Sequence, residues 1–79
     1  MLTPLNIRTA SPTDESAIAR LAQLDSAEAP AGELLIAVSG HDVVAALPVG
    51  GGRPIADPFR RTAEVVELLR LRQRQLRHG

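Results

Sequence analysis

The chain has 79 residues, nine basic and nine acidic side chains, no Cys and a single aromatic residue, Phe59. Its length predicts one small domain over residues 1–79, which buries only about 60 to 65 % of its unfolded surface. The zero net charge argues against a nucleic-acid coat protein, and the lack of Cys excludes disulfides and thiolate metal sites. A small core without disulfides or metal sites is commonly stabilised by association with another chain. We therefore expect a homo-oligomer, most simply a homodimer.

The N-terminal sequence MLTPLNIRTA has no basic segment followed by a long apolar run, so we expect no secretory signal. No apolar stretch approaches the roughly 20 residues that span a bilayer. We therefore expect a cytoplasmic protein without a membrane partner. The absence of Lys beside abundant Ala and Arg is typical of a GC-rich bacterial genome.

A short strand is predicted over Leu5–Thr9, with its odd-numbered residues on one face and its even-numbered residues on the other. A helix is predicted next. Ser11 is a good N-cap, Pro12 suits the first helical position, and Asp14 falls where the acid of a capping box reaches back. We expect this helix to run to about Asp25.

The segment after this helix, residues 26–32, contains Pro30 and Gly32, which end the helix. A helix of about 14 residues is roughly 21 Å long. Seven or eight extended residues reach roughly 25 Å, which is just enough to return along it. The second strand is therefore free to pair antiparallel with the first, and a parallel pairing through a simple crossover is equally accessible.

Two apolar runs, Leu34–Val38 and Val43–Leu47, predict a β-hairpin around the turn at residues 39–42. A third, shorter run, Pro54–Ala56, follows a turn of three glycines. Both long runs are apolar on successive residues, which predicts burial on both faces of the sheet. Pro48 cannot donate to a strand ladder, so it marks a strand end, a bulge or an edge.

A second helix is predicted from Thr62, its cap, to about Arg77. Its apolar stripe consists of Val65, Val66, Leu68, Leu69 and Leu76. The first helix can cover one face of the sheet, and this stripe can cover the other. We therefore predict an α+β fold with a small, mainly antiparallel sheet. The elements follow in the order β-α-β-β-β-α, with the helices on opposite faces. The third strand of the meander, around Ile55, is expected to leave a sheet edge open for pairing.

Residues 7–14 read IRTASPTD and precede a helix with Ile18, Leu21 and Leu24 on its apolar side. This resembles the I-R-x-A-x-x-x-D run that opens the GNAT-type N-acetyltransferase family. The hairpin runs are similar to the second and third strands of that family. The resemblance covers nearly the whole chain and implies the N-terminal half of the GNAT fold.

In that family a turn of the type (Q/R)-x-x-G-x-(G/A) opens a helix and binds the acetyl-CoA pyrophosphate through backbone N–H groups. The matching segment here is 60–65, with Arg60 in the basic position, but Ala63 and Val65 replace the glycines. Glu64 adds a negative charge where phosphate would bind. The chain also has no Tyr to serve as general acid and no counterpart of the fifth strand. The resemblance thus implies a truncated domain, for which we expect no self-contained acetyltransferase activity and no catalytic residue.

The cofactor-binding candidates implied by the resemblance are Arg60, Arg61, Thr62 and Ala63. A helix N-terminus beside basic side chains is suited to an anion such as a CoA phosphate. The alternative is a solvated helix start with Thr62 as its cap, which Glu64 favours because it opposes an anion.

Arg70, Arg74 and Arg77 recur at helical spacing and could bind phosphates of nucleic acid or CoA. The alternative is a solvated face, partly paired with Glu67. No aromatic residue lies between these arginines to stack on bases, so we do not expect a nucleic-acid partner.

His41 and Asp42 lie in the predicted hairpin turn, where ordinary turn chemistry explains Asp42. One His cannot form a metal site, and His78 is expected in a frayed terminus. The leading hypothesis is therefore a non-catalytic GNAT-like domain that acts by self-association or by binding another protein. The alternatives are acetyl-CoA binding or N-acetyltransferase activity completed by oligomerisation, and weak nucleic-acid binding through the C-terminal Arg helix.

Overall fold

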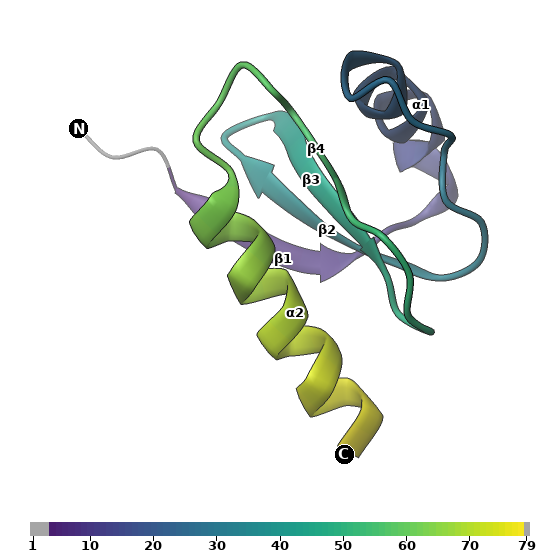
Figure 1. The fold of residues 1–79 in the computed structure, drawn as a ribbon, viewed down its shortest axis with the longest axis vertical. Coiled ribbons are helices and arrows are strands. Elements are labelled where there is room, and N and C mark those ends of the chain that lie inside the picture. The colour runs from purple at the N-terminus through teal and green to yellow at the C-terminus, as the bar shows by residue number, and fades with distance from the viewer. Residues whose placement is uncertain (1–3, 79) are drawn as a thin grey trace.

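The computed structural model describes residues 4–78 (Figure 1). Its strands are β1 (Leu5–Thr9), β2 (Leu34–Ser39), β3 (Asp42–Pro48) and β4 (Ile55–Ala56). Its helices are α1 (Glu15–Leu24), which follows a 3-10 turn over Pro12–Asp14, and α2 (Ala63–His78). The prediction of a small α+β fold with an antiparallel sheet and two helices is confirmed.

The strands lie in the order β1-β2-β3-β4, and each neighbouring pair is antiparallel. The pairing of the first two strands, which the linker length left open, is therefore antiparallel, with Ile7 opposite Ala37. The chain returns from the end of α1 to the start of β2 in one loop (Figure 1). Gly40, in the turn between β2 and β3, has a φ of 65°, in the left-handed region that glycine adopts without strain.

One face of the sheet is covered by α1. The helix buries Ile18, Leu21 and Ala22. They form a cluster with the sheet residues Leu34, Ile36, Ala46 and Ile55. Since alternate residues of a strand point to opposite faces, this cluster takes every second apolar side chain of the hairpin.

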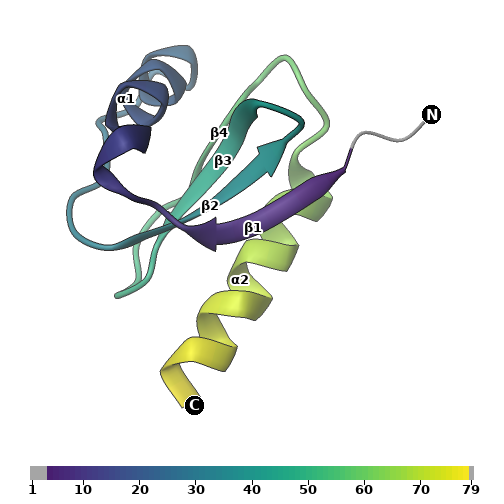
Figure 2. The same ribbon diagram turned by 180° about the vertical axis from the view of Figure 1, so that it is seen from behind.

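The opposite face is covered by α2, which lies across the sheet from α1 (Figures 1 and 2). Leu69 of α2 is fully buried in a second cluster on this face, with Leu35, Ala37, Val44, Ala45 and Leu47. A register shift between Ala37 and Val38 accompanies the placing of two successive β3 residues, Val44 and Ala45, in this one cluster. The predicted burial of the hairpin on both faces is confirmed.

Only part of the predicted apolar stripe of α2 faces the sheet. Leu69 is buried and Val65 and Val66 are half-buried, but Leu68 and Leu76 are 44 % and 48 % exposed. Neighbouring residues of a helix point about 100° apart, so a helix that turns Leu69 into the core turns Leu68 aside. Within residues 4–78, neither helix combines the length and the apolar character needed to cross a membrane.

The edge at β4 is not open in the way that the sequence led us to expect. The Asp57 N–H donates to the Val44 carbonyl at 2.9 Å, so the Ala56 N–H points away from β3. This outward group donates to Asp25 Oδ2 at the C-terminal end of α1, at 3.1 Å. The short strand around Ile55 is thus an edge whose outward donor is already bonded, which corrects the expectation.

Candidate functional site

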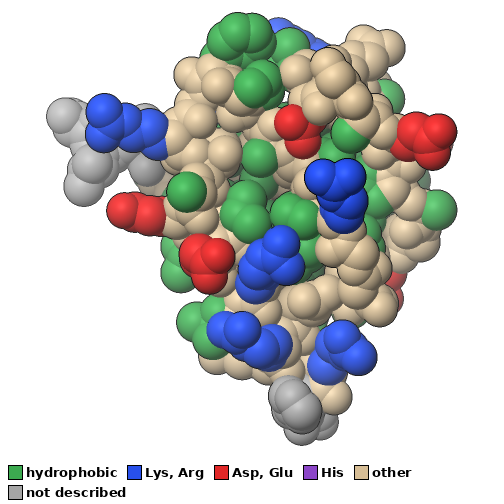
Figure 3. All heavy atoms as spheres, viewed as in Figure 1, with side chains coloured by type: hydrophobic (Ala, Val, Ile, Leu, Met, Phe, Trp, Pro, Cys, Tyr) green, Lys and Arg blue, Asp and Glu red, His purple; other side chains and the backbone are tan. Residues whose placement is uncertain are grey.

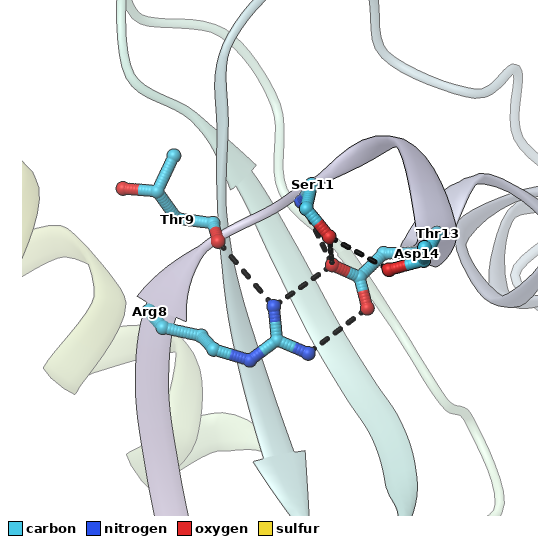
Figure 4. A network of polar contacts seen from close by, with 5 residues as sticks. All are labelled: Arg8, Thr9, Ser11, Thr13 and Asp14. Atoms are coloured by element: carbon cyan, nitrogen blue, oxygen red, sulfur yellow. Dashed lines mark hydrogen bonds and ion pairs between the residues drawn. The ribbon is translucent and has the colours of Figure 1, made fainter.

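Asp14 joins the edge strand β1 to the start of the first helix (Figure 4). Arg8 Nη1 donates to its Oδ2 at 2.8 Å, and Arg8 Nη2 donates to its Oδ1 at 2.9 Å. The Ser11 N–H also donates to Oδ2 at 2.8 Å, so the predicted reach of Asp14 back to the N-cap is confirmed. The Asp14 side chain is only 10 % exposed, whereas that of Arg8 is 48 % exposed.

These hydrogen bonds favour the charged carboxylate and hold the pKa of Asp14 well below its ordinary range. Arg8 contributes most, followed by the Ser11 N–H. The hydrogen bond to Asp14 raises the pKa of the Arg8 guanidinium in return. A carboxylate held in this way stays ionised near neutral pH and has no proton to exchange there. The pair is therefore a structural connection between strand and helix.

The start of α2 borders a cavity of about 670 Å³, together with the chain before it. All four predicted cofactor-binding residues line this cavity: Arg60, Arg61, Thr62 and Ala63. The structure thus brings the candidate residues together at one place. Thr62 directly precedes α2, and its carbonyl accepts a hydrogen bond from the Val66 N–H at 2.8 Å, as the predicted helix start requires.

The cavity at the start of α2 has mixed charge. Arg60 Nη2 donates to Asp42 Oδ2 at 2.8 Å, and Arg60 Nε lies 3.5 Å from Asp57 Oδ2. The carboxylates of Asp25 and Glu64 also line the cavity. An anion entering here would meet one arginine that is already paired and several acidic groups, so its attraction would come mainly from Arg61.

The three arginines proposed as a phosphate-binding stripe lie on α2, where Arg74 and Arg77 are exposed and Arg70 is half-buried. Their placement does not distinguish a phosphate-binding stripe from a solvated helix face. Weak binding of nucleic acid by this helix therefore stays an alternative, and the expectation of no nucleic-acid partner stays a prediction.

His41 is exposed in the turn between β2 and β3, and the neighbouring Asp42 pairs with Arg60. His78 is the last residue of α2. Among residues 4–78 there is no group of three or more His, Cys, Asp or Glu placed to hold a metal ion. In the same part of the chain, no buried side-chain nitrogen or oxygen lacks a hydrogen-bond partner.

An apolar surface lies between the edge strand and the second helix. The β1–α2 surface, as we call it, consists of Leu5, Ile7, Leu68 and Leu71. The three leucines are 39 to 45 % exposed, and Ile7 is half-buried. Ile7, Leu68 and Leu71 line a shallow groove of about 300 Å³ with Arg72 and Gln75. Figure 3 has the viewpoint of Figure 1, in which β1 lies behind α2, so it shows the opposite side of the molecule. Hydrophobic side chains also reach the surface between charged ones on that side. Adjoining exposed apolar side chains of this kind mark interaction sites more often than scattered ones do.

The outer edge of β1 adjoins this surface (Figure 2). The Ala10 N–H donates to the Leu34 carbonyl at 2.8 Å, and the Gly40 N–H donates to the Pro4 carbonyl at 3.2 Å. Because hydrogen-bonded and non-bonded pairs alternate along an antiparallel ladder, even-numbered residues of β1 bond to β2. The backbone groups that point outward belong to Leu5, Ile7 and Thr9. Within residues 4–78, no strand pairs with them.

Neither the open β1 edge nor the pairing of Arg8 with Asp14 was expected from the sequence. The available signal for the edge was the alternation in Leu5–Thr9, which places two apolar side chains on one side of a strand. The signal for the ion pair was the presence of both residues in the I-R-x-A-x-x-x-D run.

Comparison of the chain with protein-family models, with curated proteins and with solved structures found no match.

Proposed function

We propose that this chain is a non-catalytic, GNAT-like interaction domain that associates with itself through the β1–α2 surface. The observation that carries the proposal is the juxtaposition of exposed leucines on α2 with the outward edge of β1. An exposed strand edge is a template for pairing with another chain, and the adjoining apolar side chains supply area that water solvates poorly. The Arg8–Asp14 pair supports the GNAT-like part of the proposal, since it gives the shared run a structural role.

A protein with a small core gains from such association. The chain is 79 residues long and has no disulfide, so apolar area covered by a partner adds directly to its stability. The zero net charge is also favourable, because two copies do not repel one another through their overall charge.

The test is the molar mass of the chain by light scattering over a range of micromolar concentrations. We expect a dimer whose fraction rises with concentration. Leu71→Gln should shift the equilibrium towards monomer, because it places an amide in the groove that Leu71 lines with Ile7 and Leu68. The matched control is Leu24→Gln on α1, where the replaced leucine is 36 % exposed on the other side of the sheet. A monodisperse monomer at all concentrations would contradict the proposal.

A second candidate is the binding of an acetyl-CoA-type ligand, alone or as an N-acetyltransferase completed by oligomerisation. It is supported by the common cavity of Arg60, Arg61, Thr62 and Ala63. Amide chemical shifts should then move in a saturable way around residues 60–65 when acetyl-CoA is added, and Arg60→Ala should weaken the affinity. Asp42→Ala, which removes one of the two carboxylates paired with Arg60 and leaves Asp57, should strengthen it. Absence of shifts at millimolar acetyl-CoA would exclude this candidate.

A further inference from the structure

We propose that the partner of the β1–α2 surface is a second copy of this chain, and that the two copies pair antiparallel through β1 about a two-fold axis at Ile7. The result is one continuous sheet of eight strands. This inference rests on the proposed self-association and specifies its geometry.

The backbone of β1 determines the register. The outward groups belong to Leu5, Ile7 and Thr9, which are all odd-numbered. A two-fold axis at Ile7 places Ile7 opposite Ile7 of the second copy and Leu5 opposite Thr9. All three outward residues of each strand then form hydrogen-bonded pairs. An axis displaced by one residue along the strand would bond fewer of them, so the register centred on Ile7 satisfies the most donors and acceptors.

The existing contacts of Thr9 are compatible with this pairing. Its carbonyl accepts a long hydrogen bond of 3.4 Å from Arg8 Nη1 (Figure 4). A carbonyl oxygen has two lone pairs and can also accept the Leu5 N–H of the second copy. Arg8 remains bonded to Asp14 at 2.8 and 2.9 Å, so the pairing breaks no contact within the chain.

The side chains fit the same axis. Ile7 lies on the α2 face of the sheet, where it packs against the cluster around Leu69. Contacts of α2 with the sheet lie mainly on β2 and β3, which leaves β1 less covered on that face. In the proposed dimer, the side chains of Leu5 and Ile7 from both β1 strands therefore form an apolar area of the sheet between the two α2 helices. Leu68 and Leu71 of both helices border this apolar area and lose exposed surface together.

The direction of α2 relative to β1 determines how the α2 helices of two copies would lie. Leu5 lies with Thr62 and Val65 along one cavity, whereas Ile7 lies with Leu68 and Leu71 along the next, so α2 runs in the same direction as β1. A two-fold axis at Ile7 reverses that direction, and the two helices become antiparallel.

The acidic residues of α2, Glu64 and Glu67, lie in its first half. Its arginines follow them, with Arg70 at the middle of the helix and Arg72, Arg74 and Arg77 in the second half. In the antiparallel arrangement the acidic half of each helix faces the basic half of the other. The surface is thus complementary to itself under this axis in charge as well as in hydrogen bonding.

The test uses single cysteines, since the chain has none of its own. In the proposed dimer the two Ile7 Cα atoms lie roughly 5.5 Å apart, within the range of about 4.4 to 6.8 Å that a disulfide spans. Ile7→Cys should therefore form a covalent dimer under mild oxidation. Asn6→Cys is the matched control one residue away. Its two copies would lie diagonally at roughly 7 to 8 Å, so we expect it to cross-link at least about tenfold more slowly.

A second measurement uses the unaltered sequence and does not depend on how the variants fold. A dimer mixed from labelled and unlabelled chains should give an intermolecular nuclear Overhauser effect between the α-protons of Asn6 and Arg8. These residues form a non-hydrogen-bonded pair across the axis, with Cα atoms roughly 4.5 Å apart.

The outcomes separate the two proposals. A dimer by light scattering that lacks the Asn6–Arg8 contact and cross-links no faster through Ile7→Cys than through Asn6→Cys would overturn this geometry and leave self-association standing. A monomer at all concentrations would overturn both. Faster cross-linking through Asn6→Cys would place the axis at Asn6 and overturn the register centred on Ile7.

Discussion

The guanidinium of Arg8 and the carboxylate of Asp14 face each other with two hydrogen bonds, at 2.8 and 2.9 Å. Arg8 belongs to the edge strand and Asp14 to the turn that starts the first helix, so the pair connects β1 to that turn. The same edge strand carries the outward groups proposed to bind a second copy. The ion pair is thus one of the contacts that hold β1 in place for that role.

Removal of the Asp14 carboxylate should destabilise the fold. Asp14→Ala takes away the acceptor of the Ser11 N–H and the partner of Arg8, and we expect the free energy of unfolding to fall by about 1 to 2 kcal/mol. Urea denaturation measures this. Asp42→Ala is the control, because its carboxylate is 62 % exposed in its pair with Arg60 and should contribute less than about 1 kcal/mol. Equal losses in the two variants would contradict the structural role of Asp14.

The stability of the protein should fall in acid through Asp14. The pKa of Asp14 is lower in the folded than in the unfolded chain. As the pH drops, the unfolded chain therefore binds more protons than the folded chain, which favours unfolding. The contribution is complete above the unfolded pKa of about 4 and is lost as the pH falls below it towards the folded pKa. The measurement is urea denaturation between pH 6 and pH 2.5, about 2 units above and about 1.5 units below the unfolded pKa. The free energy of unfolding should fall more steeply with decreasing pH for the unaltered chain than for Asp14→Asn. Parallel curves would show that Asp14 is not responsible.

Gln73 should be required for the docking of the second half of α2. Its Nε2 donates to the Pro48 carbonyl at 2.8 Å, with the Val49 carbonyl at 3.4 Å, and the residue is only 9 % exposed. Gln73→Glu replaces this donor by a carboxylate that faces carbonyl oxygens, and it should lower the free energy of unfolding by about 1 to 3 kcal/mol at neutral pH. Gln23→Glu, at an exposed position of α1 away from the β1–α2 surface, should change it by less than about 0.5 kcal/mol. A thermal or urea melt distinguishes the two, and similar values would contradict the role of Gln73.

Asp25 should protect the β4 edge. Its carboxylate accepts the Ala56 N–H at 3.1 Å. Asp25→Ala leaves this amide to solvent, so its hydrogen exchange should accelerate by roughly tenfold, which corresponds to about 1.4 kcal/mol of local opening free energy. Asp25→Asn keeps an acceptor and should preserve most of the protection. Glu28→Ala, in the loop after α1, is the exposed control. An unchanged exchange rate at Ala56 in Asp25→Ala would show that the edge is protected by something else.

The local pattern of the sequence was sufficient for the elements. Successive apolar residues in Leu34–Val38 and Val43–Leu47 predicted strands buried on both faces, and the structure buries them there. Ser11, Pro12 and Asp14 predicted a helix start, which the structure places there as a 3-10 turn leading into α1. These features depend on alternation, on helical spacing and on capping within a few residues, so they can be predicted without knowledge of distant contacts.

The sequence by itself thus determined the α+β class, the approximate bounds of each element and the cover of both sheet faces. Only the tertiary structure decided which edge is open and which leucines of α2 are exposed. Asp25 bonds the outward amide of Ala56, whereas no strand within residues 4–78 bonds the outer side of β1. Leu68 belongs to an apolar stripe by spacing, yet it is exposed because α2 turns Leu69 into the core. The physical reason is that exposure depends on how a helix lies on a sheet, and that placement is set by contacts between residues far apart in the chain.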